Sequence, residues 1–273
     1  MPRYHGQHGY GPVIRIFHWL TAILIGAAAL RGVTMIALPA TTDAEVARIF
    51  SAFSLHKTLG IAALAVILLH MIARLVTRDP GPLHPERRAE VFLARTTQLV
   101  MWGGMILLPL SGWLRHASAP GFAPILWPFG QSLPGVPADE RLSLIFQTVH
   151  LYAGWTLAAA VALHIIGAAR HAVLDQDATL ARITTGAGPY APPAGFPMVP
   201  LGIAALLWMA VLAYGLRQAP EPIPDPFVDF QGGAELQTAP EPDLSAASPA
   251  GQDAEVPLDT DQETIDMPRP PSD

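Results

Sequence analysis

Four histidines in apolar stretches share one spacing: His56 and His70 in HKTLGIAALAVILLH, and His150 and His164 in HLYAGWTLAAAVALH. An α-helix turns about 100° and rises about 1.5 Å per residue, so fourteen residues bring a side chain back to within about 40° of the same face, about 21 Å further along. Imidazoles inside a hydrocarbon layer are costly and usually have a function. Because histidine is an axial ligand of haem iron, the spacing predicts two haems stacked at different depths of a membrane.

Cysteine is absent from the 273 residues, which excludes several kinds of metal and redox chemistry. A chain without thiols has no disulfide, iron–sulfur cluster, thiolate-ligated haem, covalently attached c-type haem or zinc finger. The sequence also contains no phosphate-binding loop, catalytic triad or nucleic-acid-binding motif. The predicted haems are therefore of the non-covalent b type, and no nucleic-acid partner is expected.

The composition is that of a membrane protein. Hydrophobic residues make up 51% of the chain and charged residues 14%, against about 25% charged residues in a typical soluble domain. Five apolar runs approach the roughly 20 residues that a helix needs to cross a bilayer. The sequence thus predicts an all-α integral membrane protein with five transmembrane helices, over residues 13–38, 55–76, 96–114, 146–169 and 199–216.

The end of the chain differs from the rest. Residues 219–273 contain thirteen acidic side chains and one basic side chain, Arg269, so the net charge of −6 arises in this segment. Eleven prolines follow residue 218, and such a segment cannot bury enough apolar surface to fold alone. We expect a disordered acidic tail at 218–273. Before it we expect an N-terminal segment at 1–12, a core at 13–175, a cytoplasmic linker at 176–198 and a fifth helix at 199–217.

The basic residues favour a cytoplasmic N-terminus. In that orientation nine arginines lie on the cytoplasmic side and six basic residues on the other side, and the cluster from Arg74 to Arg95 gives the clearest bias. Five spans then place the acidic tail outside. A cleavable signal peptide over residues 1–30 is the alternative, and cleavage would remove His18.

This topology sorts the histidines by depth. His18 follows the start of the first span and His164 precedes the end of the fourth, so both lie near the inner surface. His56 and His150 open the second and fourth spans at the outer surface. Two histidines at each depth are what six-coordinate haem iron requires. Since His70 also lies near the inner surface, depth alone leaves His18 and His70 as alternatives for the inner haem.

Four motifs in this order resemble the bacterial cytochrome b561 family: RIFHWL, SLHKTLG, LPLSGW and VHLYAGW, with His164 downstream. The resemblance covers about residues 10–185 and implies a four-helix bundle that binds two haems b. It implies His18 with His164 as ligands of the inner haem, and His56 with His150 as ligands of the outer haem. It also implies electron exchange with a membrane quinone such as ubiquinone, in a bacterial inner membrane.

The chain departs from the family at two places. Members usually have an arginine where this chain has His70, and the fifth helix with its acidic tail lies outside the four-helix pattern. His70 and Arg74, one turn further on, are therefore expected beside a propionate of the inner haem. The alternative is a haem held by His70 and His164, which resembles the cytochrome b of respiratory bc complexes. His171, seven residues after His164, is expected either to bind a quinone carbonyl or a propionate, or to be solvated at the interface.

These residues, with the resemblance, predict a carrier of single electrons between a periplasmic-side donor or acceptor and the quinone pool. Some relatives oxidise superoxide and reduce ubiquinone, which would make the chain a superoxide:ubiquinone oxidoreductase. Two further functions compete with electron carriage alone: a membrane anchor for a periplasmic dehydrogenase or cytochrome c, favoured by the acidic tail, and a transporter with proton-relaying histidines. Lys57 is expected to be an ordinary flanking charge, and His116 to lie beside lipid headgroups.

Overall fold

The regular structure of the described part of the chain consists of helices. The computed structural model of the protein describes residues 9–77, 80–119, 123–127, 130–192, 195 and 197–223. The predicted disordered tail lies outside the described residues from position 224 onward.

Five helices are long and apolar enough to cross a membrane, which confirms the all-α membrane fold predicted from the apolar runs. A π-helical turn continues the fourth of them, and a short helix follows before the last. The elements are α1 (Pro12–Met35), α2 (Asp43–Val76), α3 (Arg88–Ser118), α4 (Glu140–Arg170), η1 (His171–Asp175), α5 (Thr179–Thr184) and α6 (Met198–Gln218).

The helices α2 and α4 begin before their apolar runs because polar caps stabilise additional turns. At the start of α2, the Thr42 hydroxyl accepts from the Glu45 amide, and the Glu45 carboxylate accepts from the Thr42 amide at 3.1 Å. This capping box satisfies amide groups that otherwise have no helical partner. At the start of α4, the Asp139 carboxylate accepts from the Leu142 amide at 2.8 Å. The apolar runs therefore located the five long helices, while the caps set where α2 and α4 begin.

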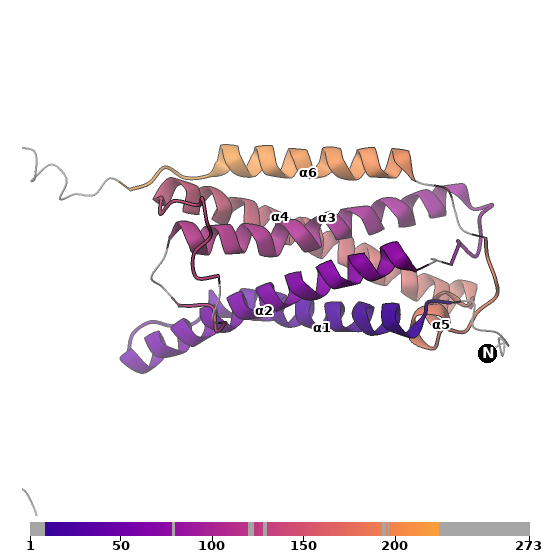
Figure 1. The fold of residues 1–273 in the computed structure, drawn as a ribbon, viewed down its shortest axis with the longest axis horizontal. Helices are drawn as coiled ribbons and strands as arrows, with labels where there is room; N and C mark the ends of the chain where they lie inside the picture. The colour runs from indigo at the N-terminus through magenta and orange to yellow at the C-terminus, as the bar shows by residue number, and fades with distance from the viewer. Residues whose placement is uncertain are drawn as a thin grey trace, which may run out of the picture. The chain divides into compact units, whose positions relative to one another are not determined.

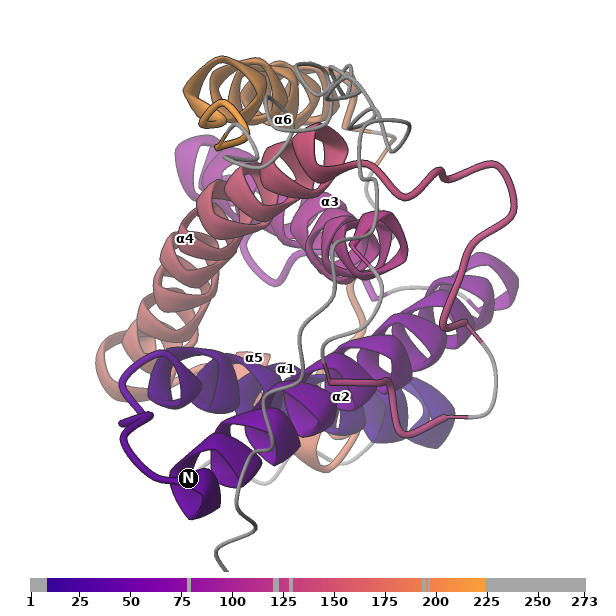
Figure 2. The ribbon, with the colours of Figure 1, turned by 90° about the vertical axis from the view of Figure 1, so that its left-hand side faces the viewer.

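The long helices alternate in direction (Figure 1). One end of the bundle, called here the His18 end, holds the starts of α1, α3 and α6 and the ends of α2 and α4. The opposite end is called the His56 end. Viewed along the bundle, α1 and α2 form one pair, α3 and α4 form a second, and α6 lies on the far side of the second pair (Figure 2).

A buried tryptophan attaches α6 to the second pair. The Trp208 indole donates a hydrogen bond to the Val100 carbonyl at 3.1 Å. It lies over Gly103 and Gly104 of α3, where a side chain would collide with the ring: a Cβ at Gly104 would lie 2.9 Å from Trp208 Cζ2. Small residues let membrane helices approach closely, which is how helix contacts gain energy in lipid. The glycine pair thus makes α6 an integral part of the bundle.

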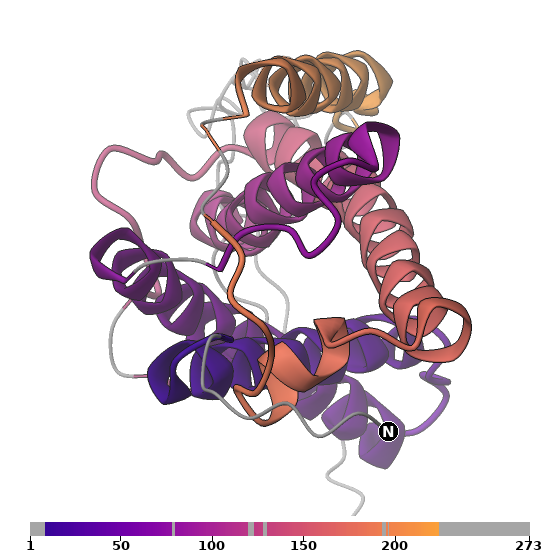
Figure 3. The same ribbon diagram turned by 90° about the vertical axis from the view of Figure 1, so that its right-hand side faces the viewer.

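The segment after α4 folds against the His18 end (Figure 3). The buried Arg182 guanidinium on α5 donates to the carbonyls of Gly81 at 2.7 Å and Pro189 at 2.5 Å. Arg15 of α1 donates to the Thr184 carbonyl at 3.0 Å. Because these bonds join α1, α5 and the α2–α3 loop, much of the predicted linker is ordered structure at the base of the bundle.

Candidate haem sites

One pair of histidines lies near the His56 end. His56 of α2 and His150 of α4 face each other with ring centroids 6.1 Å apart and ring planes 84° apart. His56 lies fourteen residues into α2 and His150 eleven residues into α4, because both helices begin well before their apolar runs. Both histidines therefore lie several turns inside the bundle, at similar distances from the end where α2 and α4 begin.

A second pair lies near the opposite end. His18 of α1 and His164 of α4 have ring centroids 6.2 Å apart and ring planes 61° apart. His18 also contacts the Trp19 ring edge-on at 5.2 Å. Since His150 and His164 share α4, that helix contributes one histidine to each pair. The structure thus brings together the four residues that the sequence predicted as ligands, in the pairs that the resemblance implied.

The spacing within each pair can be compared with that of two imidazoles on one metal. A metal–imidazole nitrogen bond is about 2 Å and the ring centre lies about 1 Å beyond the nitrogen, so two rings on opposite sides of an iron have centroids about 6 Å apart. The observed 6.1 and 6.2 Å agree with this value. Both pairs therefore fit one iron-centred group between their rings.

Comparison with known proteins gives the same chemistry. The family model of prokaryotic cytochrome b561 matches residues 9–186, more than half of the chain. The chain belongs to the prokaryotic cytochrome b561 family. It is similar to the Escherichia coli (strain K12) protein "Cytochrome b561 homolog 2", with 26% identity over 176 residues that make up 64% of this chain and 90% of that protein. The resemblance read from the sequence is confirmed: the chain is a multi-pass membrane b-type cytochrome that carries electrons through haem b.

Backbone carbonyls orient the histidines at the His56 end of the b561 core. His56 Nδ1 lies 2.9 Å from the Ala28 carbonyl oxygen, and His150 Nδ1 lies 2.8 Å from the Leu108 carbonyl oxygen. A carbonyl only accepts, so each Nδ1 carries the hydrogen and each Nε2 keeps its lone pair for a metal. Such a bond from the far ring nitrogen is the usual support of a metal-binding histidine.

Glycines provide the space for these two rings. A Cβ at Gly32 would lie 3.0 Å from His56 Cε1, and a Cβ at Gly112 would lie 3.0 Å from His150 Cε1. Each glycine follows its carbonyl acceptor by four residues, so carbonyl and glycine share one helix face. The same arrangement of carbonyl and glycine therefore supports both histidines, from α1 on one side and α3 on the other.

The LPLSGW motif acquires a specific role from this arrangement. Leu108 supplies the carbonyl for His150, Gly112 supplies the space, and the Ser111 hydroxyl lies 3.3 Å from His150 Nδ1 while donating to the same carbonyl at 2.8 Å. The sequence identified LPLSGW only as one of the four motifs that resemble the family. The role of Gly32 was not predicted, because no motif of this chain distinguishes it from the other glycine of α1, Gly26.

His70 and Arg74 both contact aromatic rings. The His70 ring is buried, stacks on Phe17 with centroids 6.0 Å apart, and tilts against Trp102 at 5.3 Å. Arg74 lies over the Trp102 ring at 5.9 Å from its centroid. His164 thus faces His18 instead of His70. His70 Nε2 is buried with no hydrogen-bond partner among the described residues, as expected for a donor that serves a group outside the polypeptide.

His171 belongs to an ionic cluster at the His18 end. Its Nε2 lies 2.9 Å from a Glu90 carboxylate oxygen and its Nδ1 lies 2.7 Å from an Asp177 oxygen. Arg170 bridges Glu90 and Asp175 at 3.1 and 3.0 Å. Burial raises the pKa of Asp177, but hydrogen bonds from Thr179 and His171 outweigh it and hold that pKa below its ordinary value. In this arrangement both His171 nitrogens face carboxylates, so the predicted contact with a quinone or propionate requires one of them to exchange its partner.

Lys57 and His116 form a polar chain at the His56 end. The Lys57 ammonium donates to His116 Nδ1 at 3.2 Å and to the Ala123 carbonyl at 2.7 Å, and His116 Nε2 lies 3.2 Å from the Gln131 side-chain oxygen. The prediction that His116 lies beside headgroups is wrong, because its side chain is buried beneath the α3–α4 connection. Lys57, next to His56, anchors this connection and is more than a flanking charge.

Proposed function

We propose that the protein is a diheme cytochrome that moves single electrons between the two faces of a membrane. One haem b lies between His18 and His164 and the second between His56 and His150. The observation that carries the proposal is the presence of two histidine pairs at opposite ends of one bundle, both at the centroid spacing of two imidazoles on one iron. Membership of the family supports haem b as the cofactor, and the two histidine pairs support two haems per chain.

The polypeptide orients and insulates these groups. When bound, a haem b supplies an iron that changes its oxidation state by one electron. The Ala28 and Leu108 carbonyls fix the tautomer of His56 and His150 and increase the basicity of each Nε2. Between the two depths, buried apolar residues such as Ile67 of α2 and Leu157 of α4 keep water from the interior. The residues thus favour electron transfer along the bundle over reactions with solvent.

The proposed exchange partners are the membrane quinone pool and a redox protein outside the membrane. The bias of basic residues supports a cytoplasmic N-terminus in a bacterial inner membrane, which makes the His56 end periplasmic. Arg141, at the start of α4, forms an ion pair with Glu221, so the described residues that follow α6 lie at that end. The thirteen acidic residues that follow position 218 then favour a basic partner, such as a periplasmic cytochrome c or a dehydrogenase subunit.

Haem quantification tests the stoichiometry. The purified protein is expected to yield two haems per polypeptide by pyridine haemochrome analysis, both removed by acid–acetone because no cysteine exists for covalent attachment. The reduced-minus-oxidised spectrum should show b-type α-bands. One haem per chain would contradict the two-pair scheme, and the absence of haem would overturn the assignment as an electron carrier.

Removal of the tail tests the proposed partner site. Truncation after Arg217 is expected to leave both haems and direct quinone reduction unchanged, since the four histidines and their supports precede α6. Binding of a basic cytochrome c should weaken, and the difference from the full chain should disappear at high salt, because exposed charges are screened beyond about 10 Å at 0.1 M.

A full-length chain with the thirteen acidic residues after position 218 changed to their amides separates charge from length. It should behave like the truncated protein. Loss of either haem on truncation would contradict the separation of tail and core, and unchanged partner binding in both variants would exclude the tail as a docking element.

A further inference from the structure

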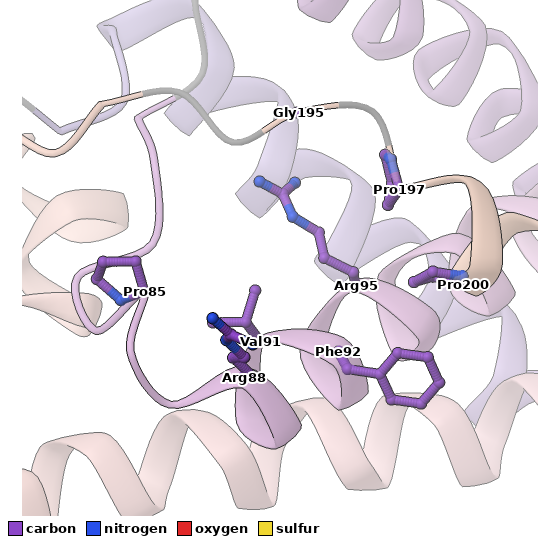
Figure 4. A pocket seen from close by; sticks show the side chains of 8 residues that line it. All are labelled: Pro85, Arg88, Val91, Phe92, Arg95, Gly195, Pro197 and Pro200. Atoms are coloured by element: carbon purple, nitrogen blue, oxygen red, sulfur yellow. The ribbon is translucent and has the colours of Figure 1, made fainter.

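A groove lies at the His18 end between the start of α3 and the residues that lead into α6 (Figure 4). It has a volume of about 230 Å³. Arg88, Phe92 and Arg95 line it from α3, and Pro197 and Pro200 line it from the opposite side. The groove is distinct from the histidine pairs, and its far wall lies beyond residue 186, outside the region that matches the b561 family.

The three α3 residues form one stripe. Positions four and seven residues after Arg88 return to nearly the same side of a helix, so Phe92 lies between the two arginines. Figure 4 labels all three among the side chains that line the groove. The wall is therefore cationic at two levels and aromatic between them.

Neither guanidinium has an anionic partner in the part of the chain that the structure describes. Arg88 makes no side-chain hydrogen bond or ion pair there, and Arg95 donates only to the neutral Gln98 oxygen at 3.3 Å. The neighbouring Arg87 and Arg170 behave differently, since each forms ion pairs with Glu90 and Asp175 within 3.6 Å. Acidic residues at this end thus neutralise one set of arginines and leave the groove positive.

The groove also lies at the start of two candidate membrane spans, α3 and α6. The start of a span is where a lipid headgroup meets the hydrocarbon layer. At the same level of these helices, between lining residues in sequence, Leu93, Met198 and Val199 expose between 57% and 68% of their surfaces. A soluble anion needs only the two arginines, whereas a phospholipid would use both the arginines and this adjoining apolar surface.

We propose that this groove binds the phosphate headgroup of an anionic phospholipid, with Arg88 and Arg95 as its ligands. The acyl chains lie along the exposed apolar residues where α3 and α6 enter the membrane. Basic pockets between transmembrane helices bind anionic headgroups in this way, through charge at the interface and apolar contact below it. Because Pro197 and Pro200 form one wall of the groove, the site depends on α6 and the residue before it.

Native mass spectrometry of the detergent-purified protein, titrated with phosphatidylglycerol or phosphatidylcholine, tests the proposal. Phosphatidylglycerol should bind at least tenfold more tightly than phosphatidylcholine. The Arg88→Gln/Arg95→Gln double variant should lose about thirtyfold in phosphatidylglycerol affinity, from about 1 kcal/mol per basic residue at the surface. The matched control, Arg48→Gln/Arg217→Gln, removes two exposed arginines from the His56 end and should bind like the unmodified protein.

Further variants keep the result interpretable. Arg88→Lys/Arg95→Lys retains both charges and should keep most of the affinity, which shows that the double glutamine variant fails through charge and not through misfolding. Competition by millimolar inorganic phosphate would assign the groove to a soluble anion and overturn the lipid proposal. Equal binding of the two lipids, or unchanged binding by the double glutamine variant, would also overturn it.

Discussion

Replacing His18 with alanine is expected to remove one of the two haems or to convert it to a five-coordinate, high-spin form. The reason is the 6.2 Å contact between the His18 and His164 rings, in which His18 is the partner that faces His164 across the bundle. Removing it leaves one imidazole for an iron that needs two axial ligands to stay low-spin. The second pair, His56 with His150, lies at the other end and should keep its haem unchanged.

Replacing His70 with alanine is expected to leave both haems low-spin. His70 stacks between Phe17 and Trp102, with centroids 6.0 and 5.3 Å away, and does not face His164. It nevertheless has a buried Nε2 without a described partner, which is available to donate to a carboxylate of the haem proposed at the His18 end. Its loss should therefore shift the midpoint potential of the haem at the His18 end without removing that haem.

Haem content, the electron paramagnetic resonance spectrum and a spectroscopic redox titration of both variants separate these outcomes. His18→Gln serves as a control that keeps a polar side chain of similar reach and should lose the same haem. If His70→Ala loses a haem while His18→Ala keeps both, the ligand scheme with His70 and His164 is correct and the pairing argued from the b561 resemblance is wrong.

The sequence predicted the depth of each histidine because depth depends only on the position of the residue along its own helix. The fourteen-residue spacing from His150 to His164, together with alternating spans, places side chains at the two ends of a bundle without reference to neighbouring helices. The partner of His164 was harder to identify, since His18 and His70 lie at the same end. The family motif around His18 favoured one of them, and the structure brings the His18 ring on α1 opposite the His164 ring on α4.

Contacts between helices could not be predicted from the pattern of apolar residues along the chain. His116 was expected at the lipid headgroups because it ends an apolar run, but Lys57 and Gln131, which are distant in sequence, surround it. The carbonyl and glycine supports of His56 and His150 were missed for the same reason. A backbone carbonyl has no sequence signature, and a glycine shows its role only when the atoms opposite it are known.

Replacing Gly32 with leucine is expected to abolish the haem between His56 and His150 while the haem at the His18 end remains. The position has little room for a side chain, because a Cβ alone would lie 3.0 Å from His56 Cε1 and 3.3 Å from its Nδ1. The remaining leucine atoms must therefore displace the imidazole from α1. That displacement also breaks the 2.9 Å bond from His56 Nδ1 to the Ala28 carbonyl, which orients the ring for iron.

The effect should be graded with side-chain size. Loss of such a supporting bond lowers metal affinity by about 10- to 100-fold in comparable sites, and an overpacked contact adds roughly 1–3 kcal/mol of strain. Gly32→Ala should keep the haem with a shifted potential, since the ring can give by a few tenths of an ångström. Gly32→Leu should leave about one haem per polypeptide, because α1 and α2 pack together along this face.

Gly26→Leu is the matched control, since Gly26 lies on the same helix and a Cβ there would meet no atom within 4 Å among the described residues. It should retain two low-spin haems by pyridine haemochrome analysis and optical spectroscopy. A Gly32→Leu protein that also retains two low-spin haems would show that His56 does not depend on this contact. Equal haem loss in both leucine variants would instead show that α1 tolerates no added bulk, so the specific role of Gly32 rests on the difference between them.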